Sequence, residues 1–159
     1  MMAESQVIQI LNFPFPITIS AAFANKSIRT GGGRYPTKAF MEYRDQVEQY
    51  RLKNLAEMKE AKKVIQEWIK SKSTLYVECA LVSDRWYNKD GTVKKRDVAN
   101  LEKVLIDSLT YCLGFDDCNI WDLRLIKIIG QIEKSNIFIE PAEVEIDGID
   151  IDPRSTVPN

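Results

Sequence analysis

A helical stretch near the middle of the chain constrains the fold most strongly. Apolar residues recur there at spacings of three and four, which places them along one face of a helix. These residues are Val98, Leu101, Leu105, Leu109 and Cys112. Gly114 follows as the expected C-terminal cap, because glycine readily adopts the left-handed backbone that ends a helix. We therefore expect a helix that ends at Gly114 and buries one apolar stripe.

A second, polar stripe runs along the same helix, and acids flank both of its ends. Asn100, Lys103 and Asp107 are three and four residues apart, so their side chains share one face. The flanking acids are Asp97 before the helix and the adjacent pair Asp116 and Asp117 after it. Acids that converge on a small site suit Mg²⁺, which prefers oxygen ligands and binds through one or two carboxylates. A nearby lysine would stabilise negative charge that develops on a leaving oxygen.

The same residues have a structural interpretation that is equally simple. Asp97 would cap the helix, and Lys103 and Asp107 would form a solvated pair one turn apart. The acids at positions 116 and 117 would then belong to an ordinary turn.

Two segments in this part of the chain, RDVANLEKVLIDSL and LGFDDCNIWDLRLIKI, resemble the RusA family of Holliday-junction resolvases. That family carries an R-D-x-D-N-x-x-K helix start, a later D-A-L and a D-D-x-x-I strand start. The resemblance implies Mg²⁺, or Mn²⁺ in its place, held by Asp97 and Asp117 with help from Asp116. It also implies that Lys103 is catalytic, that Asn100 orients a ligand or contacts phosphate, and that the protein acts as a homodimer on branched DNA.

One position departs from the family pattern. The second metal aspartate of the family falls on Ala99, which has no oxygen to offer a metal. Three outcomes remain open: another acid, Asp116 or Glu102, fills the gap; the metal binds weakly; or the protein binds branched DNA without cutting it well.

Composition narrows the chemistry further. The chain has 159 residues, of which 45% are hydrophobic and 28% charged, as expected of one globular domain. It contains no histidine, which excludes Ser-His and Cys-His nucleophilic sites. No apolar run approaches the roughly 20 residues that cross a bilayer, so we expect a cytoplasmic protein without a membrane partner. The three cysteines, Cys79, Cys112 and Cys118, are expected to be buried free thiols.

Basic residues concentrate in the segment that precedes the helix. The net charge is only −1, so a DNA-binding surface must be a local patch. The segment SDRWYNKDGTVKKR interleaves cations with Trp86 and Tyr87, as expected of a surface that grips phosphates and stacks on exposed bases. Its candidate DNA contacts, with one from the glycine-rich loop at residues 26–35, are Arg85, Lys94, Lys95, Arg96 and Arg34.

The rest of the chain predicts an α/β (α+β) domain. Residues 6–12, 74–82 and 119–129 show strand patterns, and a final strand is expected over 136–139 and 143–146. Residues 37–70 contain no proline or glycine, so they form one long helix, a helical hairpin or a helix broken near Asn54. We expect a single RusA-like domain over residues 1–146, with a mixed sheet and helices mainly on one face, and a disordered tail over 147–159.

The function predicted from the sequence is that of a Mg²⁺-dependent endonuclease that cuts four-way DNA junctions. Two alternatives remain. One is a catalytically weak or inactive junction-binding protein, which Ala99 favours. The other is a structural or partner-binding domain without nucleic acid, which would be favoured if the basic segment pointed away from the acids.

Overall fold

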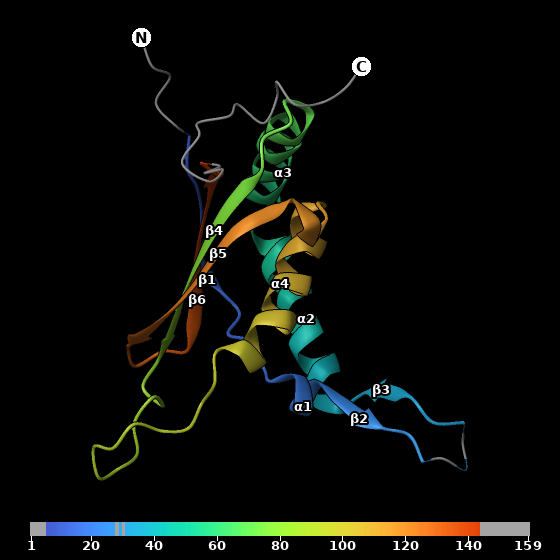
Figure 1. Cartoon of the computed structure of the whole chain (residues 1–159), viewed down its shortest axis with the longest axis vertical. Helices are drawn as coiled ribbons and strands as arrows, with labels where there is room; N and C mark the ends of the chain where they lie inside the picture. The colour runs from blue at the N-terminus through green and yellow to red at the C-terminus, as the bar shows by residue number, and fades with distance from the viewer. Residues whose placement is uncertain (1–5, 28, 30, 144–159) are drawn as a thin grey trace, which may run out of the picture.

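The structure is a computed structural model that describes residues 6–27, 29 and 31–143 (Figure 1). These residues form one mixed four-stranded sheet in the order β1-β6-β4-β5, with a separate two-stranded hairpin. The main sheet consists of β1 (Ile8–Phe13), β4 (Leu75–Ser83), β5 (Ile120–Ile129) and β6 (Lys134–Pro141). The hairpin consists of β2 (Phe23–Asn25) and β3 (Arg34–Pro36). The predicted α+β class is confirmed.

The helices lie against one face of the sheet, as expected (Figure 1). They are α1 (Ile19–Ala22), α2 (Lys38–Lys53), α3 (Leu55–Lys70), α4 (Ala99–Leu113) and the 3₁₀ helix η2 (Asp117–Asn119). In β4 the side chains of Leu75, Val77, Cys79 and Leu81 are fully buried, whereas the intervening Tyr76, Glu78 and Ala80 are partly exposed. This period of two is that of a strand with a single covered face. No helix in the described part of the chain is both long and apolar enough to cross a bilayer.

Helix α4 connects the only two strands of this sheet that run parallel. β4 pairs with β5 in parallel, whereas β1 with β6 and β6 with β4 are antiparallel. Parallel neighbours need a crossover connection, and α4 supplies it. Leu101, Leu105 and Leu109 of the predicted apolar stripe are fully buried. The helix ends at Gly114, whose φ of 65° is left-handed, so the predicted cap is confirmed.

The long region over residues 37–70 is broken at one residue. Thr37 caps α2 by accepting a hydrogen bond from the Phe40 amide at 3.2 Å. Asn54 separates α2 from α3, and its side-chain amide donates to the Tyr50 carbonyl at 2.9 Å. Of the three paths that the sequence allows, the break near Asn54 is therefore the one that forms.

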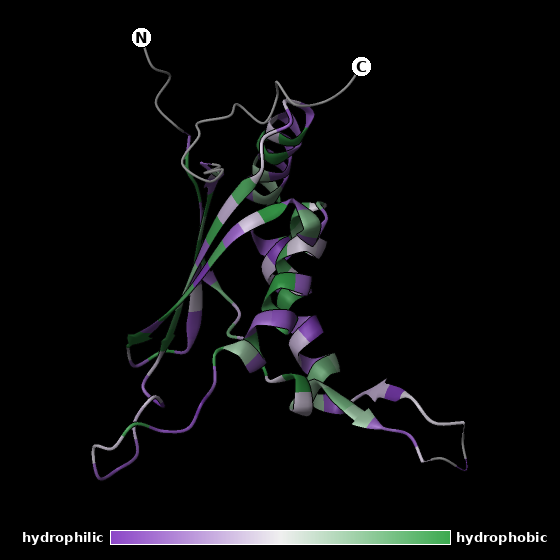
Figure 2. Cartoon of the chain, viewed as in Figure 1, coloured by the Kyte–Doolittle hydropathy of each residue, from purple (hydrophilic) through white to green (hydrophobic). Residues whose placement is uncertain are grey.

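Two segments project from the same end of the molecule as the start of α4 (Figure 1). One is the β2–β3 hairpin, whose tip contains Gly31, Gly32 and Gly33, all with positive φ. The other is the loop over residues 84–98, which Figure 2 shows to be mainly hydrophilic. Asp90 and Gly91 form the predicted turn in this loop, where the Asp90 carboxylate accepts from the Thr92 amide at 2.9 Å.

Several details differ from the sequence predictions. No helix was predicted over residues 19–22, where the short helix α1 forms and Thr18 caps it by accepting from the Ala21 amide. Cys118 is exposed rather than buried, because it lies in the η2 turn at the surface. The final strand is the continuous β6, and the expected strand residues 144–146 and the tail 147–159 lie outside the described residues.

One arginine anchors the 84–98 loop to the end of the sheet. The Arg96 guanidinium lies over the rings of Phe15 and Trp86, at 4.7 and 5.1 Å from their centroids. Its Nη1 is 3.1 Å from Glu133 Oε1 and 3.2 Å from the hydroxyl of Ser83. Cation–π contacts combined with an ion pair are typical of arginine at a partly buried site. Residues distant in sequence thus fix the backbone immediately before Asp97.

Glu133 is the acid that holds this anchor in place. Burial by itself raises the pKa of Glu133, but hydrogen bonds from Ser83 and Arg96 and the charges of Arg96 and Arg85 together hold that pKa below its ordinary value. A carboxyl with a lowered folded-state pKa stabilises the fold above its unfolded pKa of about 4.3. That contribution is lost as the pH falls through the lower folded-state pKa.

We predict that Glu133→Gln lowers the free energy of unfolding by about 1–2 kcal/mol at neutral pH, because the variant leaves a partly buried guanidinium without its counter-charge. The difference from the parent should shrink as the pH falls below the unfolded pKa of about 4.3 and through the lower folded-state pKa of Glu133. Urea unfolding at several pH values measures both effects. Glu60→Gln on the exposed side of α3 is the control; if both variants unfold alike, Glu133 is no anchor.

Candidate active site on helix α4

Lys103 on the polar stripe of α4 lies between two carboxylates. Its Nζ donates a hydrogen bond to Asp107 Oδ1 at 2.8 Å. The same atom is 3.8 Å from Asp117 Oδ2, which comes from η2 after the helix has ended. The structural interpretation of Lys103 and Asp107 as a pair one turn apart is therefore correct, but Asp117 joins it. We call these three residues the Lys103 cluster.

The Lys103 cluster keeps its ammonium protonated. The hydrogen bond to Asp107 contributes most to raising the pKa of Lys103, followed by the charge of Asp107, while the slight burial acts in the opposite direction. All three side chains remain more than half exposed, so an incoming anion can reach them. A protonated lysine at an accessible surface can accept a phosphate as its partner.

Asp116 is the acid with a structural task. Its Oδ1 accepts a hydrogen bond from the Cys118 amide at 2.9 Å and so caps η2. That backbone hydrogen bond is the largest of the interactions that lower the pKa of Asp116. The turn interpretation is thus correct for Asp116, and this cap holds the neighbouring Asp117 in η2.

Asp97 lies at the other end of α4. Its Oδ1 accepts from the Ala99 amide at 2.9 Å, although Val98 rather than Asp97 occupies the capping position of the helix. Asp97 and Asn100 share the wall of an open hollow of about 550 Å³ with a set of cations. These cations are Lys94, Lys95, Arg96 and Lys127. We call this feature the basic hollow.

Lys127 is a residue of the basic hollow that sequence analysis missed. It lies on β5, where its Nζ is 5.1 Å from the centroid of the Trp86 ring. Lys127 pairs in register with Leu81 of β4, so its side chain emerges on the helix-covered face at the end of the sheet. The alternation within residues 120–129 indicates on which face of the sheet Lys127 lies. It does not indicate that Lys127 lies near residues 94–97.

The predicted DNA-contacting residues fall into two groups. Lys94, Lys95 and Arg34 are exposed, and Arg34 lies on the β2–β3 hairpin. Arg85 is 69% exposed and lies 4.0 Å from Glu133. Arg96 is only 22% exposed and its charge is already paired, so it serves the anchor described above.

The predicted aromatic stacking surface is only half present. Tyr87 is exposed, but Trp86 is 3% exposed and its indole N–H donates to the Ile128 carbonyl at 2.9 Å. The prediction that Trp86 stacks on bases is therefore wrong, because this side chain packs into the core beneath Arg96. Its position among cations in the sequence reflects the Arg96 anchor.

The acids considered as substitutes for the missing aspartate lie apart from one another. A further acid, Glu78 on β4, forms an ion pair at 3.6 Å from Arg124, on the sheet face away from the helices. Glu102 is partly buried in the first turn of α4. Asp116 adjoins Asp117 and caps η2, whereas Glu102 adjoins Lys103, so each of these two acids borders the Lys103 cluster in sequence.

The carboxylates near Lys103 are of the kind that binds a divalent metal, but they are fewer than a tightly bound metal needs. No group of three or more Asp, Glu, Cys or His side chains that could hold a metal ion occurs among residues 6–27, 29 and 31–143. Two carboxylates do meet at one cation in the Lys103 cluster. Mg²⁺ at phosphate-processing sites uses one or two protein carboxylates, with water and substrate phosphate supplying the other ligands.

Comparison with known families identifies the chain. A family model described as Endodeoxyribonuclease RusA matches residues 16–140, which includes α4, the Lys103 cluster and the basic hollow. A search of curated proteins finds no match. The matched segment spans most of the chain and extends from the approach to α1 as far as β6. The chain therefore belongs to the RusA endodeoxyribonuclease family, whose members resolve Holliday junctions.

Proposed function

We propose that this protein hydrolyses backbone phosphodiesters at four-way DNA junctions as a metal-dependent homodimer. The observation that carries the proposal is the Lys103 cluster, in which an exposed ammonium lies between Asp107 and Asp117 beside the basic hollow. This arrangement pairs a charge that attracts phosphate with carboxylates that suit a metal. The homodimer is carried over from the family resemblance, and two copies would suit a substrate that needs two cuts.

The residues divide the chemistry among them. Lys94, Lys95 and Lys127 would hold phosphates on either side of the reacting one, because lysines act as point charges toward the DNA backbone. Lys103, kept protonated by Asp107, would stabilise the negative charge that develops on the leaving oxygen. Asn100, between the basic hollow and the Lys103 cluster, would orient the backbone or a ligand.

A divalent metal completes this proposal. Asp117 and Asp97 would hold it, with Asp116 keeping Asp117 in place. Bound Mg²⁺ would supply a polarised phosphoryl oxygen and an activated water.

The two projecting segments suit a branched rather than a linear substrate. The 84–98 loop carries Arg85, Lys94 and Lys95, and the β2–β3 hairpin carries Arg34. Both extend from the end of the molecule at which α4 begins (Figure 1). Separate basic arms on either side of one site can contact two helical arms of a junction, and the backbone contacts give affinity without sequence preference.

The alternative function is junction binding with little or no cleavage. Ala99 favours it, since its methyl side chain has no oxygen to bind a metal and its backbone N–H is already donated to Asp97. In that case the basic hollow would bind DNA while the acids lack the number needed to retain a metal.

We predict that Asp117→Asn abolishes nicking of a synthetic four-way junction in Mg²⁺ and leaves junction binding within about twofold of the parent. The variant loses one charged oxygen ligand, while the basic hollow is unchanged. Nicking is followed on strand-labelled junctions, and binding by gel shift in Ca²⁺. Asp122→Asn on β5 is the matched control, and nicking by Asp117→Asn at the parent's rate would remove Asp117 from the site.

We predict that the double variant Lys94→Ala/Lys95→Ala weakens junction binding and flattens its salt dependence. Each phosphate contact contributes about 0.9 to the slope of log affinity against log salt, so two contacts contribute roughly 2. Fluorescence anisotropy at several salt concentrations measures the slope. The control is Lys59→Ala/Lys63→Ala, which removes two exposed lysines from α3; an equal slope in both variants would show that the loop does not touch DNA.

We predict that Ala99→Asp lowers the metal concentration needed for half-maximal nicking by about tenfold. An added carboxylate supplies the missing oxygen, and an acid in the first turn of a helix also suits the helix dipole. Titrations with Mg²⁺ and with Mn²⁺, compared with Ala99→Asn, isolate the effect of the charge. Unchanged activity would mean that Asp116 or Glu102 already serves, and binding without any nicking by either protein would establish the junction-binding alternative.

A further inference from the structure

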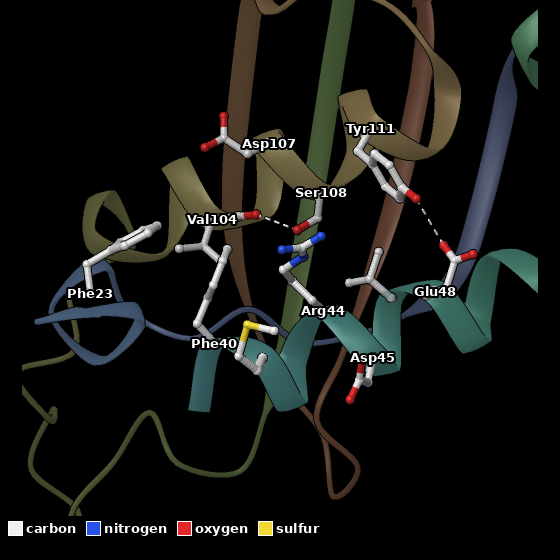
Figure 3. Close-up of a pocket in the computed structure, with 11 residues that line it drawn as sticks. Phe23, Phe40, Arg44, Asp45, Glu48, Val104, Asp107, Ser108 and Tyr111 are labelled. Carbon is white, nitrogen blue, oxygen red and sulfur yellow. Dashed lines mark hydrogen bonds between the residues drawn. The ribbon is translucent and has the colours of Figure 1, made fainter. Parts of the chain in front are cut away.

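A second cavity lies between α2 and α4, and Asp107 is one of its lining residues (Figure 3). Its volume is about 380 Å³, which is in the range of small-molecule pockets. Its apolar and aromatic walls come from the β2–β3 hairpin and both helices, and include Phe23, Phe40, Val47, Val104 and Tyr111. We call it the aromatic cavity.

The walls of the aromatic cavity carry three rings, of which those of Phe23 and Phe40 are partly buried and that of Tyr111 is exposed. The rings of Phe23 and Phe40 are 4.9 Å apart between centroids and tilted by 41°. Tyr111 is 63% exposed, and its hydroxyl donates to Glu48 Oε2 at 3.3 Å. Aromatic rings that line a cavity can stack on a nucleobase with little dependence on sequence, because every base has a π face.

Polar groups in the cavity include both donors and acceptors. The Arg44 side chain extends from α2 toward Ser108 on α4 (Figure 3). Arg44 lies 6.0 Å from the centroid of the Phe40 ring and forms no ion pair within the described part of the chain. Glu48 stays charged, because its hydrogen bond from Arg51 lowers the pKa of this carboxyl. A base edge, which also carries both donors and acceptors, matches such a set.

The position of the aromatic cavity links it to the DNA-processing surface. Asp107 lines the cavity and also binds Lys103, so the two features share one residue. Asn100 of the basic hollow precedes Asp107 by seven residues, or about 10 Å along the helix. That distance is roughly the rise of three nucleotides in a B-form strand. The residues of α4 that line the cavity run from Val104 to Tyr111, so the cavity lies alongside the Lys103 cluster, and the basic hollow lies toward the start of the helix.

We propose that the aromatic cavity binds a single nucleobase of the junction strand, taken from an unpaired or easily unpaired position at the branch point. The proposal rests on the proposed function, since it assumes that DNA lies along α4. Extruding a base costs least where pairing is already broken, so a cavity of this kind favours branched over linear DNA. Base capture would thereby contribute to selectivity for branched DNA. Phe40 would stack on the base, and Arg44 would contact its edge.

The test uses four-way junctions that carry the fluorescent adenine analogue aminopurine at one branch-point position at a time. Stacking within DNA quenches this analogue, so capture in the cavity changes its emission. The parent should change the emission at one position. Arg44→Ala and Phe40→Leu should abolish that change and weaken junction binding about fivefold or more, with linear duplex binding unaffected. Phe40→Leu keeps apolar volume, and Lys38→Ala removes a cation from the same helix outside the cavity as the control.

Three results would overturn base capture. The first is an identical emission change in the parent and in both variants while the junction remains bound. The second is an emission change at no branch position. The third is that sedimentation shows the variants dissociating into single chains while the emission does not change. The occupant of the aromatic cavity would then be a second copy of the chain. A parent that binds and changes emission but never nicks would refute the nuclease proposal alone, because the fluorescence requires only binding.

Discussion

The parallel pairing of β4 with β5 is the constraint on which the site depends. Parallel neighbours cannot be joined by a tight turn, so the chain must cross the sheet between them. Helix α4 makes that crossing with Leu101, Leu105 and Leu109 fully buried against the sheet. Because one face of the helix is committed to the core, its opposite face must carry the polar stripe. The crossover also returns η2 alongside α4, and this brings Asp117 to within 3.8 Å of Lys103.

The basic residues near α4 serve two purposes: the arginine anchors the loop, and the lysines remain available to bind phosphate. Arg96 lies over two rings and pairs with Glu133, a combination for which the planar guanidinium is suited. The lysines of the basic hollow are compact, hydrated charges; Lys127 lies near the Trp86 ring, but none of the three forms an ion pair within the described part of the chain. A single run of cations in the sequence thus contains one residue that shapes the loop and others that remain free to meet phosphate.

Local patterns in the sequence were sufficient to predict the helices and strands, but not the contacts between them. Helix α4 ends at Gly114 as predicted, and α2 breaks at Asn54, which is one of the three paths left open for residues 37–70, because caps and periodicity act over a few residues. The burial of Trp86 could not be predicted, since it results from Phe15, Arg96 and Ile128, which are far from it in sequence. The exposure of Cys118 was missed because its apolar neighbours belong to the strand that begins after η2. In the candidate site, spacing predicted the approach of Asn100, Lys103 and Asp107, but tertiary structure alone placed Lys127 beside Asp97.

The unequal contacts of Lys103 bear on how a site with few acids could still hold a metal. Its Nζ is 2.8 Å from Asp107 and 3.8 Å from Asp117, so Asp107 holds the ammonium and Asp117 is only loosely engaged. At exposed positions such as these, an ion pair contributes little, about 1 kcal/mol or less. A divalent ion would therefore displace little stabilising energy on binding Asp117, while Asp107 kept Lys103 charged. DNA phosphates would supply further oxygen ligands where Ala99 supplies none, which makes metal and substrate binding mutually dependent. In such a site the loss of one carboxylate lowers metal affinity in the free protein more than in the complex with DNA.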